Sequence, residues 1–409
     1  MNAPDRRLDA PEAAGTLPRD ARDLAAWDMI RRLVAFDTTS RESNLALIEW
    51  VRDYLAGFGI ASSLTFDDDR RKANLFATLP AADGNTREHG VVLSGHTDVV
   101  PVDGQPWETD PFTATAVGDR VVGRGVTDMK SFSATGLALV PLFLSKPLAR
   151  PLHFALSYDE EVGCIGVRRL IAELAPQGVR PAGCIVGEPT GMRLVVAHKG
   201  KKSWRCRVRG HEAHSSLTPH GVNAVEIGAR LVSRLADIAQ RFRASGVRDD
   251  GYDVPYTTVH VGTIRGGTAL NIVPRDCTFD FEVRHLPFDE PDAVFAEIRD
   301  YAQGFVPAMR AVAPDTGIAF EPLSTMPGFD TADGTEVAAL GHDCSGGAGA
   351  GKVSFGSEAA LFHAASIPTV ICGPGHIAQA HQPNEWCAVE QLARCEQFMR
   401  RLAHRLHAA

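Results

Sequence analysis

The sequence of 409 residues predicts an α/β protein with a mostly parallel sheet and helices on both faces, interrupted by an inserted α+β domain. Three observations indicate this. Short apolar runs, typical of buried strands, alternate with helical patterns along most of the chain. Acidic residues and histidines directly follow those runs, where an α/β fold places its binding sites. Between about residues 201 and 325 the pattern changes to strands that alternate polar and apolar residues.

The elements of the α/β part follow from apolar periodicity and from the residues that end each run. Residues 22–36 and 43–57 have helical periodicity, and Ser43 is the expected cap of the second helix. The other expected strands are 61–66, 73–79, 91–93, 152–158, 184–187 and 368–372. The other expected helices are 132–143, one after Gly163 to about Leu174, 335–341, 357–364 and 389–407.

The inserted part has an order of its own. Its expected elements are strand 202–208, helix 222–241, strands 257–264 and 277–284, helix 292–304 and strand 317–322. The order strand–helix–strand–strand–helix–strand is typical of a ferredoxin-like antiparallel sheet.

The chain is longer than one hydrophobic core usually supports, so we expect two domains. Residues 21–200 and 326–409 would form the first domain, and residues 201–325 the inserted one. Residues 1–20 contain Pro, Ala and charged residues without an apolar run. They predict a flexible N-terminal extension and not a signal peptide.

Composition excludes several classes of partner. The net charge of −8 and the absence of a Lys and Arg run argue against nucleic acid, and the apolar runs are too short to span a membrane. The eight cysteines are scattered without a Cys-x-x-Cys pair, which predicts free thiols in a reducing cytoplasm.

Histidines and carboxylates collect at the ends of the expected strands. The candidates are His96, Asp98, Asp128, Glu160, Glu161, Glu188 and His381. Imidazoles and carboxylates without a thiolate suit zinc or another borderline divalent ion. There are more donors than one tetrahedral ion needs, so they suit two ions roughly 3.5–4 Å apart that share a bridging carboxylate and a water.

Two pairs in this set have specific expected roles. In an extended segment His96 and Asp98 point to the same side, and a metal-bound histidine usually donates its second ring N–H to a carboxylate. Glu160 and Glu161 follow a buried strand, so one is expected to bind metal while the other accepts a proton from water. The alternatives are a surface His–Asp pair and two solvated acids.

Five motifs together resemble the di-zinc family of aminoacylases, deacylases and carboxypeptidases. They are Ser-Gly-His-Thr-Asp (94–98), Gly-Arg-Gly-x-x-Asp-Met-Lys (123–130), Asp-Glu-Glu (159–161), Gly-Glu-Pro-Thr (187–190) and Ala-His-Gln-Pro (380–383). The resemblance implies a zinc-exopeptidase-like catalytic domain with an inserted lid and dimerisation domain. It also implies two Zn²⁺ per subunit, with Co²⁺ as a substitute, a homodimer and a cytoplasmic location.

The resemblance also implies individual roles. His96, Asp128 and Glu188 would hold one metal ion, and Asp128, Glu161 and His381 the other, with Asp128 as the bridge. Asp98 would orient His96, and Glu160 would be the general acid and base. The Asp128–Met129 peptide bond would be cis.

Three residues of the inserted domain resemble substrate-contacting residues of the family. His214 would reach the partner subunit's site and stabilise the oxyanion, Arg284 would bind a substrate carboxylate, and Asn271 would donate a hydrogen bond nearby. The alternatives are that Arg284 forms a surface ion pair and that His214 only caps a turn.

Within the family, residues 197–200, 254–260, 266–274 and 373–383 resemble the bacterial acetylornithine deacetylase branch, as does Glu358. The expected reaction is hydrolysis of N2-acetyl-L-ornithine to L-ornithine and acetate, in arginine biosynthesis. Alternatives are succinyl-diaminopimelate desuccinylase, a broader N-acyl-amino-acid amidohydrolase or dipeptidase, or an inactive binding protein. The strands lack a Gly-x-Gly-x-x-Gly turn, which argues against a nucleotide enzyme.

Overall fold

The computed structural model describes residues 17–347 and 349–408, which form two compact units. Within these residues, unit 1 extends to Ala197 and includes Asp330–Gly351 and the chain from Ser357 onward, whereas unit 2 is His198–Phe329 with Lys352–Gly356. The sequence-based boundaries placed 198–200, 326–329 and 352–356 in the first domain instead. Within unit 2, the ammonium of Lys352 lies 2.9 Å from Asp249 Oδ2. Of the expected extension, residues 1–16 lie outside the described residues.

A nine-stranded sheet forms the centre of unit 1, in the order β1-β2-β6-β3-β7-β15-β8-β13, with β14 beside β8. Its strands are β1 (Ser62–Phe66), β2 (Ala73–Leu79), β3 (Val91–His96), β6 (Leu152–Ser157), β7 (Gly183–Pro189), β8 (Val195–His198), β13 (Phe329–Asp330), β14 (Gly351–Val353) and β15 (Thr369–Gly373). The four strands β6, β3, β7 and β15 are parallel. Antiparallel pairing occurs on either side of them. The predicted mostly parallel centre is confirmed.

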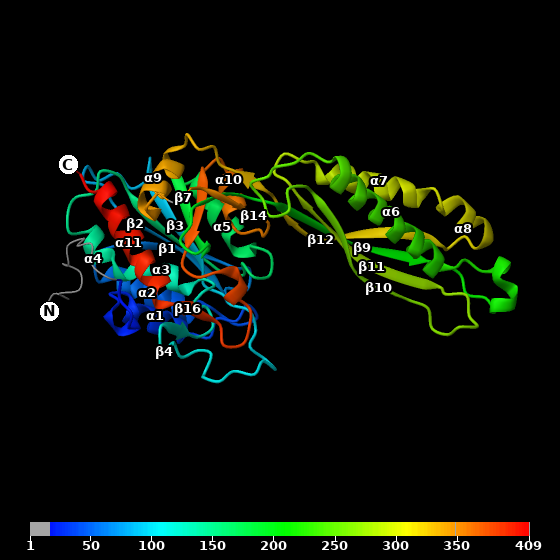
Figure 1. Cartoon of the computed structure of the whole chain (residues 1–409), viewed down its shortest axis with the longest axis horizontal. Coiled ribbons are helices and arrows are strands. Elements are labelled where there is room, and N and C mark those ends of the chain that lie inside the picture. The colour runs from blue at the N-terminus through cyan, green and yellow to red at the C-terminus, as the bar shows by residue number, and fades with distance from the viewer. Residues whose placement is uncertain (1–16, 348, 409) are drawn as a thin grey trace. The chain divides into compact units, whose positions relative to one another are not determined.

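Helices cover both faces of this sheet. Leu93 and Ser94 are consecutive in β3 and therefore point to opposite faces. Leu93 lies on the side of α3 and α11, whereas Ser94 Oγ donates to Glu358, next to α10. The helices of unit 1 are η1 (Ala21–Asp23), α1 (Trp27–Val34), α2 (Leu45–Ala56), α3 (Lys130–Ala138), α4 (Val140–Phe143), α5 (Ile165–Leu174), α9 (Glu336–Ser345), α10 (Ala359–Ala364), η3 (Ile377–Gln379) and α11 (Val389–Leu406) (Figure 1).

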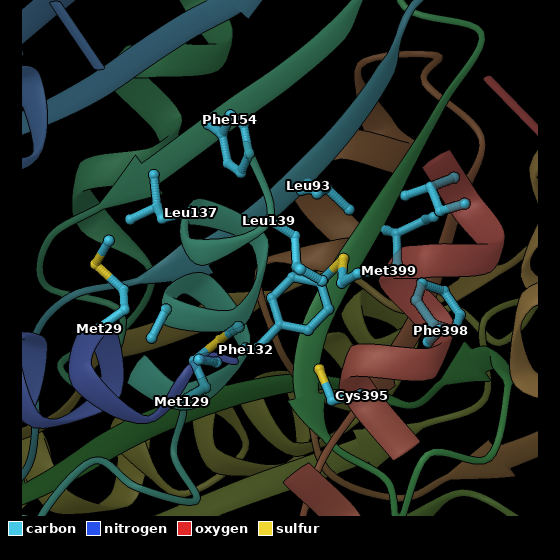
Figure 2. Close-up of a cluster of buried hydrophobic side chains, with 14 of the residues drawn as sticks. Met29, Leu93, Met129, Phe132, Leu137, Leu139, Phe154, Cys395, Phe398 and Met399 are labelled. Atoms are coloured by element: carbon cyan, nitrogen blue, oxygen red, sulfur yellow. The ribbon is translucent and has the colours of Figure 1, made fainter. Parts of the chain in front are cut away.

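A buried apolar cluster anchors α3 between the sheet and α11. Met129 and Phe132 of the α3 segment lie near Phe398 and Met399 of α11 (Figure 2). A side-chain carbon on Gly136 would come within 3.0 Å of Phe154 on β6, so the helix approaches the sheet closely there. This packing fixes the chain immediately after Asp128.

Local details differ from the sequence-based expectations. The helix expected over 132–143 is divided into α3 and α4, because Pro141 lacks an N–H for a continuous helix and starts a new one instead. Asn44, and not Ser43, is the N-cap residue of α2. A small sheet of β4 (Thr115–Val117), β5 (Arg120–Val122) and β16 (Trp386–Ala388) was not expected, since three-residue strands are too short to show alternation.

Unit 2 has the ferredoxin-like arrangement. Its antiparallel sheet has the order β10-β11-β9-β12. The elements are β9 (Gly200–Arg209), η2 (Ser215–His220), α6 (Ala224–Ser245), β10 (Thr258–Gly266), β11 (Asp276–His285), α7 (Pro291–Gln303), α8 (Val306–Val312) and β12 (Gly317–Met326). Figure 1 shows α6, α7 and α8 along one face of this sheet. Alternate residues of β11 are buried beneath them, and the ring of Trp204 stacks 4.9 Å from that of Phe295.

No helix in the described part of the chain combines the length and the apolar character that a membrane crossing requires.

Candidate metal centre

The candidate centre lies in unit 1, at the carboxyl ends of the central strands. His96 is the last residue of β3, Glu188 lies at the end of β7, and Glu160 and Glu161 follow β6. Parallel neighbours end at the same edge of a sheet, which places these side chains together. Asp128 and His381 come from two loops, and the peptide bond after Asp128 is cis, as the resemblance predicts.

Asp128 lies between two imidazoles. Its Oδ1 is 3.0 Å from His96 Nε2 and its Oδ2 is 3.1 Å from His381 Nε2. Glu161 Oε2 is 3.0 Å from the same nitrogen of His381, and Glu188 Oε1 is 3.8 Å from His96 Nε2. The carboxylate of Asp128 therefore directs one oxygen to each side of the cluster.

The donor set fits a metal site. One atom each of His96, Glu160 and Glu188 lie within 4.8 Å of one another, and so do atoms of His96, Asp128 and Glu161. These atoms are imidazole nitrogens and carboxylate oxygens, the donors that borderline divalent ions accept. The first group includes Glu160, for which the resemblance implies a proton-transfer role instead.

The acids of the cluster are crowded and buried. Burial raises the pKa of Glu160 to about 8, and the nearby carboxylates of Glu161 and Asp128 act in the same direction. Burial likewise raises the pKa of Glu188 well above its ordinary value, helped by the charges of Asp128 and Glu160. Hydrogen bonds to Asp128 and Glu161 raise the pKa of His381 to about 10. A bound cation would offset the repulsion among these carboxylates.

The contacts of Asp98 differ from the expected ones. His96 Nδ1 lies 2.8 Å from the Asp98 main-chain oxygen and 3.6 Å from the carboxylate, so the carbonyl is the closer acceptor. The carboxylate instead accepts the backbone N–H groups of Glu160 at 3.0 Å and Glu161 at 3.3 Å. It also accepts the hydroxyl of Ser40 at 2.7 Å. Asp98 thus holds the Glu160–Glu161 backbone as well as the ring of His96.

Sequence reasoning missed several residues that support the centre. Cys164 donates its thiol hydrogen to Glu160 Oε1 over 3.0 Å, and Lys72 lies 2.6 Å from Asp159 Oδ1. Glu385 accepts the backbone N–H of Asp128 at 3.1 Å. The contacts of Lys72 and Glu385 join residues far apart in the chain, so spacing gives no sign of them, whereas Cys164 lies only four residues from Glu160. For Glu385, its position just after the Ala-His-Gln-Pro motif was a clue.

The other three predicted residues belong to unit 2. His214 is exposed and caps η2, with Ser216 N–H 3.2 Å from its Nδ1. Ser215 N donates to Asn271 O over 3.0 Å, so His214 and Asn271 lie in adjoining segments. Arg284 Nε is 3.0 Å from Glu282 Oε1. The local contacts of His214 and Arg284 agree with the alternatives of a cap and an ion pair, and the roles of all three stay predictions.

Several curated relatives are similar to this chain over most of its length. The chain is 36% identical over 379 residues to acetylornithine deacetylase of Myxococcus xanthus, covering 92% of this chain and 96% of the relative. It is 32% identical over 354 residues to acetylornithine deacetylase of Proteus mirabilis, covering 86% and 87% of the two chains.

Solved structures share the fold. The aminopeptidase PepT of Bacillus cereus has a TM-score of 0.74 at 22% identity, with 96% of this chain and 100% of that chain covered. The YXEP protein of Bacillus subtilis, described as a dinuclear metal binding peptidase, has a TM-score of 0.67 at 15% identity, with 92% and 96% covered. At these identities the likeness shows the fold alone.

The family model of peptidase family M20/M25/M40 matches residues 92–405, a span that contains all the candidate ligands. The cluster of imidazoles and carboxylates at the strand ends is the part of the chain suited to hold metal. The chain therefore belongs to peptidase family M20/M25/M40 and is a metallohydrolase that acts on amide bonds.

Proposed function

We propose that this protein hydrolyses N2-acetyl-L-ornithine to L-ornithine and acetate, a step of arginine biosynthesis. The observation that carries the hydrolytic site is the carboxylate of Asp128, with one oxygen 3.0 Å from His96 Nε2 and the other 3.1 Å from His381 Nε2. The choice of a small acylated amino acid as substrate rests on relatives named acetylornithine deacetylase at 30–36% identity.

Two Zn²⁺ ions are the proposed cofactors, with Co²⁺ as a substitute. His96, Asp128 and Glu188 would hold one ion. Asp128, Glu161 and His381 would hold the other, so that Asp128 bridges the two. When bound, such ions polarise the amide carbonyl and lower the pKa of a shared water.

Glu160 is the proposed proton carrier. Its carboxylate accepts a proton from the attacking water as the C–O bond forms, and it gives that proton to the departing amine nitrogen as the C–N bond breaks. Its backbone is held by Asp98, and the Cys164 thiol, 3.0 Å from Oε1, fixes one carboxylate oxygen.

Unit 2 would supply the substrate contacts. His214 Nδ1 accepts the Ser216 N–H, which leaves Nε2 as the ring's hydrogen-bond donor for a developing oxyanion. The guanidinium of Arg284 would bind the substrate α-carboxylate, and Asn271 would donate a further hydrogen bond.

The positions of these residues favour a homodimer. Arg284 lies eight residues beyond Asp276 along β11, roughly 27 Å at about 3.4 Å per residue, whereas His214 and Asn271 lie near the start of that strand. One small substrate cannot contact both ends of a single copy of unit 2. We therefore propose that the partner subunit supplies His214 and Asn271. All eight cysteines are free, which supports a reducing cytoplasm as the location.

The experiment is a substrate panel on metal-stripped protein with Zn²⁺ or Co²⁺ restored. We expect no turnover without metal and a higher kcat/KM for N2-acetyl-L-ornithine than for N-succinyl-L,L-diaminopimelate, other N-acetyl amino acids or dipeptides. A preference for the succinyl substrate or for dipeptides would replace the deacetylase assignment with that activity. Turnover that resists complete metal removal would overturn the mechanism.

A further inference from the structure

We propose that Gln105, Arg124 and Glu385 form a positioning network that holds Asp128 and His381 at the distance a shared ion needs. The inference rests on the proposed function, because it takes Asp128 and His381 as metal ligands. None of the three network residues is itself a ligand in that proposal.

Glu385 fixes the loop that carries Asp128. Its carboxylate is buried, and its Oε1 accepts three backbone N–H groups, from Gly125 at 3.0 Å, Thr127 at 2.9 Å and Asp128 at 3.1 Å. Gly125 has a φ of 84°, a left-handed conformation that only glycine adopts without strain, and this turn lets the N–H groups converge. A carboxylate 257 residues away thus replaces the hydrogen bonds that secondary structure would have supplied.

Arg124 connects this carboxylate to a second loop. Its side chain is 1% exposed, its Nη1 donates to Glu385 Oε2 over 2.7 Å, and its Nη2 donates to Gln105 Oε1 over 2.6 Å. The guanidinium is planar, so these two bonds fix both partners relative to each other. A buried ion pair of this kind is a weak source of stability but a strong determinant of geometry.

Gln105 links Arg124 to the loop that contains His381. Its Oε1 also accepts the indole N–H of Trp107 over 3.0 Å, so two donors determine which way the amide faces. Its Nε2 consequently faces the main-chain oxygen of His381, to which it donates over 3.3 Å.

His381 needs such support more than the other proposed ligands do. Its side chain is 48% exposed, whereas those of the other four are at most 7% exposed. Its φ of 63° lies in the left-handed region, which is unfavourable for a residue with a Cβ. Its main-chain position is therefore held by neighbouring loops, and Gln105 is one of those contacts.

The test measures metal affinity in the full-length protein, by titrating metal-stripped protein with Zn²⁺ against a chromophoric chelator. Gln105→Leu removes the amide at a half-buried position, so folding should survive. We expect two sites in the wild type and, in Gln105→Leu, an about 10-fold weaker second site, the size typical for loss of a group that orients a ligand. The matched control is Gln382→Leu, next to His381, whose amide donates to Ala378 O over 3.2 Å within its own segment.

Glu385→Gln is the second variant. Its circular dichroism spectrum is first compared with that of the wild type to check that it is folded, and its zinc affinity is then measured by the same titration. Weaker second-site binding in both Gln105→Leu and Glu385→Gln, with wild-type binding in Gln382→Leu, supports the network. Equal affinity in Gln105→Leu and the wild type overturns it while leaving the proposed function intact. A wild type that binds no zinc overturns the proposed function and the network with it.

Discussion

Units 1 and 2 place their candidate functional residues in opposite environments. In unit 1 the proposed ligands lie close together, with an atom of Glu160 within 4.8 Å of atoms of His96 and Glu188, and four of the five ligands have side chains at most 7% exposed. In unit 2, His214 and Asn271 are exposed and Arg284 is one-third exposed. His214 and Arg284 form hydrogen bonds to near neighbours in sequence, Ser216 and Glu282. Burying several carboxylates together is costly without a compensating charge, whereas leaving a histidine or an arginine at the surface costs little.

Buried and exposed residues differ in how strongly their contacts indicate a function. A buried acid cluster has no structural reason to exist unless a cation or a reaction uses it, so its geometry points to a function. An exposed residue with a local partner has an adequate structural explanation of its own. Experiments on unit 1 can therefore contradict the proposed mechanism, whereas experiments on unit 2 test only which residues contact the substrate.

Replacing Glu160 should lower turnover more than any other substitution considered. Glu160→Ala should lower kcat for N2-acetyl-L-ornithine by about 10³-fold, because proton transfer from water and to the amine is lost. Metal content should stay at the wild-type level, and Glu42→Ala, an exposed acid, is the control. Loss of one metal ion would instead make Glu160 a ligand, as its position within 4.8 Å of His96 and Glu188 allows. A near-normal kcat would remove Glu160 from both roles.

A buried histidine outside the centre gives unit 1 a pH dependence of its own. Burial lowers the pKa of His153 to about 4, and its Nδ1 lies 2.9 Å from Thr78 Oγ1. Since the unfolded chain binds the proton more readily, the stability contribution of neutral His153 is present above pH 6.5 and is lost as pH falls toward 4.

The free energy of unfolding of the metal-free protein should therefore fall by roughly 3 kcal/mol over this range from His153 alone. His153→Gln should flatten that slope in urea titrations at pH 7, 5.5 and 4.5. His285 of unit 2 is the matched site for the same substitution, because burial also lowers its pKa. The same slope in His153→Gln and the wild type would show that His153 does not set the acid stability of unit 1.

Arg284→Lys tests unit 2. We expect KM for N2-acetyl-L-ornithine to rise about 10-fold with little change in kcat, because an ammonium cannot make the two parallel hydrogen bonds of a guanidinium to a carboxylate. Arg207→Lys, on the same sheet and paired with Glu321, should leave KM unchanged. If Arg284→Lys behaves like Arg207→Lys, Arg284 is only the partner of Glu282.

The smallest effect should come from Ser40→Ala, which removes the hydroxyl that donates to Asp98 Oδ2 over 2.7 Å. A single hydrogen bond contributes about 1 kcal/mol, so kcat should fall about 5-fold through a less rigid Glu160–Glu161 backbone. Ser43→Ala is the control, because that hydroxyl donates to Arg71 O instead. Equal kcat in both variants would show that Asp98 does not depend on Ser40.

Much of the fold was predictable because apolar periodicity reports burial directly. The strands ending at His96 and at Ser157 and the alternating strands of unit 2 were expected within a few residues of their observed ends. The small sheet of β4, β5 and β16 and the division between α3 and α4 were not, since three-residue strands and a proline-started turn leave little periodic signal.

Which side chains are available for chemistry could be read from the amino-acid order: seven histidines and acids at strand ends or in motif loops, in an arrangement that resembles a metallohydrolase family. Their distances and partners depend on the folded chain. In the folded chain Asp128 lies between two imidazoles. The carboxylate of Asp98 accepts hydrogen bonds from the Glu160–Glu161 backbone, and Glu385 accepts the backbone N–H of Asp128. The physical reason is that hydrogen bonds and charge interactions depend on distance in space, and a span of 257 residues leaves no periodic trace in the sequence.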